Sequence, residues 1–158
     1  MLSILVVFFA RALLVLLFLP FSALDKLLNF NQAVGQAAQV TSVRPVAVAL
    51  ICVGLFIEVT MSCAILSGIA DRLAAAILAA YCLMTAALWK QFWKSGDFRL
   101  HGPSKGRETF WDFLKNLSVA GGFLMLTFGT TTAGVQTFLH DPFASTHPYI
   151  SPAAGNGS

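Results

Sequence analysis

Four long apolar stretches dominate this chain and restrict the folds open to it. They cover about residues 2–24, 46–68, 73–92 and 113–132. Each is close to the roughly 20 residues that an α-helix needs to cross the hydrocarbon core of a bilayer. Backbone groups in lipid must bond within their own segment, so stretches of this length without strand-like alternation are predicted to be helices. The expected fold class is therefore all-α, an integral membrane bundle of four helices within residues 1–132.

The composition agrees with lipid as the main solvent. Of the 158 residues, 57% are hydrophobic and 11% are charged, whereas soluble domains contain about 25% charged residues. The net charge is only +3 and no run of residues is densely basic, which argues against a nucleic-acid-binding protein. We therefore expect the lipid bilayer, and no nucleic acid, as the partner of most of this surface.

A cleaved signal peptide is the alternative interpretation of the first apolar stretch. Signal peptides have a basic amino-terminal region, a short apolar core and a cleavage site of small residues. Here no Lys or Arg precedes Arg11, which interrupts an apolar stretch longer than such a core. We therefore predict a retained membrane span.

The basic residues are distributed unevenly between the connections. Lys and Arg gather in the first connection and above all in the third, whereas the second contains only Arg72 and the tail from residue 133 contains none. Cytoplasmic connections carry the excess of Lys and Arg. We predict a multi-pass protein of a bacterial inner membrane, with connections one and three in the cytoplasm and both termini in the periplasm.

Two connecting segments have recognisable character. Residues 26–40 carry apolar residues at helical spacing among Asn and Gln, which predicts a short interfacial helix on the cytoplasmic surface. Residues 133–158 are rich in Pro, Ser and Gly and are predicted to form an extended periplasmic tail. The tail is either a disordered end or a segment that binds a neighbouring chain through Phe143, Pro148 and Tyr149.

Two opposite charges lie deep in the first two spans. Arg11 and Glu58 fall near the middle of their stretches, and antiparallel packing puts them at matching depth. Charges at this depth are costly and usually face inward and pair, so we predict an Arg11–Glu58 pair. Further polar side chains would extend it into a seam inside the bundle: Ser22, Lys26, Ser62, Asn116 and Thr127. The pair either fixes the helix register or forms a site for protons or a polar ligand, such as a quinone headgroup.

Other reactive residue types give weak signals. Cys52, Cys63 and Cys82 all fall within spans and form no C-x-x-C motif, so we interpret them as packing residues. His140 and His147 provide too few ligands for a metal. We predict no metal site, no catalytic residue and no cofactor bound by this chain alone.

Three segments together resemble the DoxX family of small four-helix membrane proteins. They are FARALLVLLFLPFSALDKLL in the first span, SGIADRLAA after Glu58, and FWDFLKNLSVAGGFLML in the fourth span. The resemblance covers about residues 9–126 and makes these the characteristic positions: Arg11, Lys26, Glu58, Gly68, Arg72, Asn116 and Gly121. Ser22 and Ala23 stand where the family often has Gly before the Lys.

The resemblance implies a membrane subunit rather than an independent enzyme. DoxX-like proteins include a small subunit of a thiosulfate:quinone oxidoreductase and others associated with membrane redox assemblies. One hypothesis is a subunit of a quinone-linked complex that anchors partner chains, with quinone or lipid as its ligand. The other is an accessory subunit that fills the edge of a membrane assembly without a redox role. A small transporter is the least favoured function, since four helices leave little room for alternating access.

Overall fold

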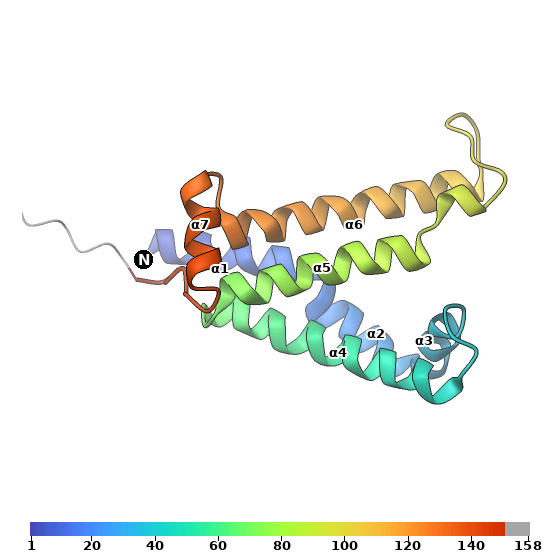
Figure 1. The fold of residues 1–158 in the computed structure, drawn as a ribbon, viewed down its shortest axis with the longest axis horizontal. Helices are drawn as coiled ribbons and strands as arrows, with labels where there is room; N and C mark the ends of the chain where they lie inside the picture. The colour runs from blue at the N-terminus through green and yellow to red at the C-terminus, as the bar shows by residue number, and fades with distance from the viewer. Residues whose placement is uncertain (151–158) are drawn as a thin grey trace, which may run out of the picture.

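The protein is a bundle of helices that run almost the full length of the molecule (Figure 1). The structure, a computed structural model, describes residues 1–150, and no strand occurs among them. The long segments are α1 (Leu2–Val15) continued by α2 (Ala23–Leu28), α4 (Arg44–Ser67), α5 (Asp71–Trp89) and α6 (Lys105–Phe128); the short helices are α3 (Phe30–Ala37) and α7 (Thr132–His140). The predicted all-α fold is confirmed, and α3 lies within the segment predicted to form an interfacial helix.

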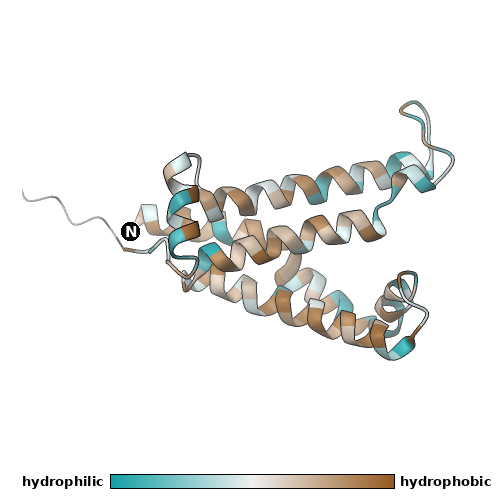
Figure 2. Ribbon diagram, in the orientation of Figure 1, coloured by the Kyte–Doolittle hydropathy of each residue, from teal (hydrophilic) through white to brown (hydrophobic). Residues whose placement is uncertain are grey.

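The long helices have the length and hydropathy of membrane spans. Leu2–Leu28, Arg44–Ser67 and Asp71–Lys94 qualify separately, and α6 with α7 qualifies as a fourth span if the bent pair is counted as one. Hydrophobic residues cover most of α4 and α5, and hydrophilic residues gather towards the ends of the bundle (Figure 2). Many large apolar side chains of α1 and α4 are exposed, as expected for surfaces that face lipid.

The two ends of the bundle differ. One end, which we call the terminal end, carries the N-terminus, the turn between α4 and α5, and α7; the other, the loop end, carries α3 and the connection between α5 and α6 (Figure 1). Along the bundle, α5 packs on α6 through small side chains. Ala75, Ala79, Cys82 and Ala86 are all buried, and such residues allow helix backbones to approach closely.

The first span is not the continuous helix that was predicted for residues 2–24. An irregular segment, Leu17–Ser22, separates α1 from α2 and contains Leu19 with non-helical dihedral angles and Pro20. Proline has no N–H group to donate and its ring clashes with the preceding turn. The break redirects the chain, so α2 does not continue the line of α1 (Figure 1).

The fourth long helix begins earlier than predicted, at Lys105 instead of residue 113. The hydroxyl of Ser104 accepts from the backbone N–H of Arg107, and the carboxylate of Asp97 accepts from the N–H groups of Gly106 and Lys105, each at 2.9 Å. The Gly106 N–H and then the Lys105 N–H hold the pKa of Asp97 below its ordinary value. These contacts satisfy donors that a helix start leaves free, so the polar residues from Lys105 onward are helical.

The predicted extended tail is also only partly right. Thr132–His140 forms α7, whose N-cap Thr131 accepts from the N–H of Gly134, and α7 is bent by 74° from α6. Gly129 allows this bend because its backbone has a positive φ of 68°. Residues 141–150, which we call the strap, contact the turn between α4 and α5 at the terminal end, and residues 151–158 lie outside the described part.

Candidate functional site

The predicted Arg11–Glu58 pair is wrong, because each residue has a different ionic partner. Arg11 Nη1 lies 2.7 Å from Asp71 Oδ2, while Glu58 pairs with Lys26. The estimate of matching depth assumed one straight helix over residues 2–24. Side chains in a helix tilt towards its N-terminus, which directs Arg11 to the start of α5, and the break at Pro20 brings Lys26 against α4.

Lys26, Glu58 and Tyr81 form a partly buried polar cluster, which we call the carboxylate cluster. Lys26 Nζ and Tyr81 Oη both donate to Glu58 Oε1, the latter at 2.7 Å, and Lys26 Nζ also donates to Ser22 Oγ at 2.8 Å. Glu58 is 1% exposed, and within residues 1–150 its Oε2 has no hydrogen-bond partner. The cluster thus combines a primary amine, a carboxylate and a phenol in the apolar interior of the bundle.

Gly54 gives Tyr81 its position in the carboxylate cluster. A Cβ atom at Gly54 would lie 3.0 Å from Tyr81 Oη, so the phenol could not approach α4 as closely with alanine there. Gly54 precedes Glu58 by one helical turn, and residues four apart lie on the same helix face. Gly54 therefore provides the space into which the Tyr81 hydroxyl extends to reach Glu58.

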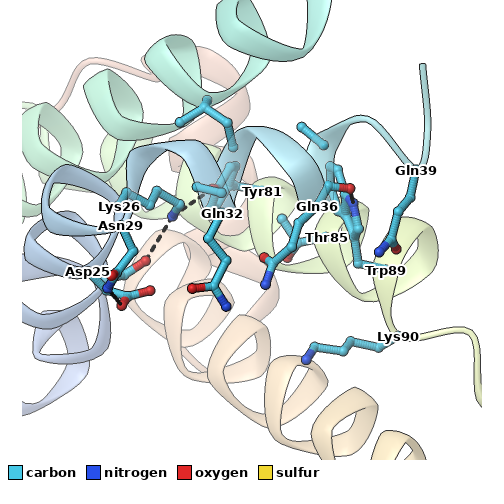
Figure 3. A pocket seen from close by; sticks show the side chains of 14 residues that line it. Asp25, Lys26, Asn29, Gln32, Gln36, Gln39, Tyr81, Thr85, Trp89 and Lys90 are labelled. Carbon is cyan, nitrogen blue, oxygen red and sulfur yellow. Dashed lines mark hydrogen bonds between the residues drawn. The ribbon is translucent and has the colours of Figure 1, made fainter. Parts of the chain in front are cut away.

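A polar pocket of about 440 Å³ lies beside the carboxylate cluster, between α2 and α3 on one side and α5 on the other (Figure 3). Four residues with amide side chains line one wall: Asn29, Gln32, Gln36 and Gln39. We call these four the amide stripe. The remaining wall includes Lys26, Tyr81 and Trp89, so the pocket connects the carboxylate cluster with the loop end of the molecule.

A second polar cluster occupies the terminal end. Arg11 donates to Ile65 O at 2.7 Å and to Thr146 Oγ1 at 2.6 Å. The backbone N–H of Thr146 donates to Asp71 Oδ1 at 2.9 Å, and the Thr146 hydroxyl donates to Asp71 Oδ2. Asp71 is fully buried, because the strap covers the Arg11–Asp71 ion pair at the terminal end.

Two of the residues predicted to bind a partner chain contact this chain itself. Tyr149 Oη donates to Leu66 O, and a Cβ atom at Gly68 would lie 2.7 Å from Pro148 Cδ. Ser145 Oγ donates to Gly68 O. Phe143 is 70% exposed. Binding of a neighbouring chain by these residues stays a prediction.

The other residues of the predicted seam do not form one continuous line. Ser22 and Lys26 join the carboxylate cluster, and Ser62 is buried, its hydroxyl without a partner in the part of the chain that the structure describes. Thr127 donates to Phe123 O and Arg72 O, at 3.0 and 3.2 Å, and so links α6 to α5. Within residues 1–150, no side-chain hydrogen bond joins Asn116 to either cluster.

The roles of Tyr81, Asp71, Thr146 and the amide stripe were not predicted from the sequence. The stripe had a usable signal, because Asn29, Gln32, Gln36 and Gln39 recur every third or fourth residue, the spacing of one helix face. Tyr81 and Thr146 had none, since their roles depend on contacts between distant segments. Among the described residues, no group of three or more His, Cys, Asp and Glu side chains is placed to hold a metal ion.

Comparison with known proteins identifies the family. The DoxX family model matches residues 6–91, which is more than half of the 158 residues. The chain belongs to the DoxX family. No curated protein and no solved structure shows a significant match to it.

The DoxX match contains the whole carboxylate cluster and the Arg11–Asp71 pair, but it ends before α6 and the strap. The segment of α6 that was compared with the family therefore lies outside the match. DoxX membership together with the apolar helices makes this a multi-pass membrane protein.

Proposed function

We propose that this DoxX protein is a membrane subunit of a larger, quinone-linked complex of the bacterial inner membrane, and that a quinone headgroup binds in the polar pocket. The observation that carries the proposal is the position of the pocket beside a buried carboxylate, Glu58, that Lys26 and Tyr81 contact. Ionisable groups within a membrane bundle are costly and commonly mark ligand or proton sites. We propose in addition that both termini lie in the periplasm, which places the loop end of the pocket on the cytoplasmic side.

Lys26 is the residue best placed to meet a quinone carbonyl. An ammonium group has three N–H donors, and Lys26 gives two of them to Glu58 and Ser22. Its remaining contact, with Tyr81 Oη, is 3.5 Å long, at the outer limit of a hydrogen bond. A carbonyl oxygen in the pocket replaces this weak contact with a stronger one, without breaking the ion pair to Glu58.

The binding can be measured through Trp89, which lines the pocket. In a Trp93→Phe/Trp111→Phe protein, Trp89 is the remaining tryptophan, and a short-chain benzoquinone added to vesicles should quench its fluorescence saturably. Replacing Lys26 with Met in a Glu58→Gln background removes the ion pair without leaving a lone charge and should weaken binding about tenfold, since one charge-assisted hydrogen bond is lost. Quenching that only rises linearly with quinone, in both proteins, would remove the proposal.

The alternative is an accessory subunit whose buried charges are structural. It is favoured by one observation: Arg11 and Lys26 both find ionic partners within the chain, and these pairs tie α1 to α5 and α2 to α4. Glu58→Gln separates the two functions when assembly and quinone-linked turnover are measured in the same membranes. If Glu58 belongs to a quinone site, the Glu58→Gln protein loses quinone-linked turnover while the complex still assembles. If Glu58 is only part of a structural ion pair, assembly and turnover are lost together.

A further inference from the structure

We propose that the amide stripe makes the pocket selective for benzoquinone headgroups with oxygen-bearing ring substituents over fused naphthoquinones. This inference rests on the proposed function, in which the pocket binds a quinone, and it names the class of quinone. The observation behind it is the alignment of Asn29, Gln32, Gln36 and Gln39 along one wall of the pocket (Figure 3).

The packing of α3 fixes the direction of the stripe. Val34 and Ala37 of α3 are buried against Ala47 of α4, and Ala37 also reaches the edge of the pocket. The indole N–H of Trp89 donates to the backbone carbonyl of Gln36 at 3.1 Å and ties α3 to α5 across the pocket. The helix therefore cannot rotate its amide side chains away from the pocket without exposing its apolar face.

The glutamine amides are available to a ligand. Within residues 1–150 no intramolecular hydrogen bond uses the side chains of Gln32, Gln36 or Gln39, whereas the Asn29 amide donates to Asp25 Oδ1 at 2.8 Å. Each glutamine provides two N–H donors and a carbonyl acceptor. The wall is thus a row of neutral donors and acceptors.

The charges around the pocket favour a neutral ligand. Lys26 is paired with Glu58, and Lys90 Nζ lies 3.1 Å from Asp112 Oδ2. Asp25, a further carboxylate, also lines the pocket. Because carboxylates compensate both lysines, the pocket has no surplus positive charge with which to hold a phosphate or carboxylate headgroup.

A quinone ring with alkoxy substituents matches this wall. Its carbonyl and ether oxygens accept hydrogen bonds from the glutamine amides, while Lys26 meets a carbonyl at the inner end. A naphthoquinone instead presents the apolar edge of its second ring, which covers the amides without bonding them. The residues of the amide stripe are exposed, so the second ring displaces water that bonds these amides without replacing its hydrogen bonds, which lowers affinity. We expect about a tenfold preference for the alkoxy benzoquinone.

The test compares two quinones of equal alkyl chain length, a dimethoxy-benzoquinone and a naphthoquinone, by quenching of Trp89 in the Trp93→Phe/Trp111→Phe protein. Gln32→Leu/Gln36→Leu should weaken binding of the benzoquinone about tenfold and should strengthen that of the naphthoquinone, because its second ring then covers apolar side chains instead of amides. Leucine at position 36 keeps the backbone carbonyl that Trp89 contacts. Asn31→Leu is the matched control, since Asn31 is exposed on α3 and does not line the pocket.

The outcomes separate the inference from the proposed function. Saturable binding of both quinones with equal affinity overturns the selectivity and leaves the quinone site standing. A preference that survives in the double variant also overturns the role of the stripe. If neither quinone quenches saturably in the parent protein, the proposed function is contradicted, and the inference falls with it.

Discussion

Arg11 of α1 and Asp71 of α5 form a buried ion pair, with Arg11 Nη1 2.7 Å from Asp71 Oδ2. Thr146 of the strap bonds to both partners. A buried pair that loses one member leaves an uncompensated charge, at a cost of roughly 3–5 kcal/mol in soluble proteins. The strap therefore bonds to an ion pair whose disruption would strongly destabilise the terminal end.

We expect Asp71→Ala to lower the free energy of unfolding by roughly 3–5 kcal/mol, because Arg11 is then left without its counter-charge. Unfolding in mixed micelles with increasing denaturing detergent measures the change. Asp141→Ala is the control, since Asp141 is exposed at the start of the strap. Equal stability of the two variants would mean that the pair does not hold α1 against α5.

Thr146→Val keeps the shape of the side chain and removes its hydroxyl. It should lower stability by about 1–3 kcal/mol, since Arg11 Nη2 and Asp71 each lose a partner in a partly buried site. Phe143→Ala, at a strap residue that is 70% exposed, should have little effect on stability. A larger loss for Phe143→Ala than for Thr146→Val would contradict the strap contacts.

Two glycines should respond to alanine in opposite directions. Gly68 has a φ of 78° and leaves no room for a Cβ beside Pro148, so Gly68→Ala should destabilise the turn between α4 and α5 and release the strap. Gly35 lies within α3, with nothing near the position of a Cβ, so Gly35→Ala should stabilise by about 0.5–1 kcal/mol through helix propensity. Thermal unfolding of both variants measures the two signs.

The start of α6 should depend on pH through Asp97. The backbone N–H groups of Gly106 and Lys105 lower the pKa of Asp97 from its ordinary 3.8. The stability that the Asp97 carboxylate gives to the start of α6 is therefore fully present above pH 3.8. It is lost as pH falls through the pKa of the folded state. Hydrogen exchange of the Gly106 and Lys105 amides, relative to the intrinsic rate, should lose protection in that acidic range. In Asp97→Asn this pH dependence should be absent.

Much of the fold could be predicted because the bilayer imposes a length on each span. The bounds predicted for the second and third spans, 46–68 and 73–92, lie within a few residues of α4 and α5. The early start of α6 was missed, because Asp97 and Ser104 act through hydrogen bonds that hydropathy does not register. The helix α7 was missed because a Pro-, Ser- and Gly-rich composition describes the tail as a whole but not Thr132–His140.

Less of the candidate site than of the fold could be predicted from the sequence. Charge and depth identified Arg11 and Glu58 as important but not their partners, because the break at Pro20 changes which residues meet. The spacing of Asn29, Gln32, Gln36 and Gln39 was present in the sequence. Its meaning depends on α3 lying opposite α5, which only the tertiary structure shows.

Photolabelling tests the central claim, a quinone site in the pocket, most directly. A short-chain quinone that carries a photoreactive azide is irradiated with the protein in vesicles, and the labelled peptides are mapped by mass spectrometry. The account expects label on α3 around Gln32 and Gln36 or on α5 near Trp89, and loss of that label when unmodified quinone is added in excess. Label confined to the lipid-facing surface of α1, unchanged by the competitor, would contradict it.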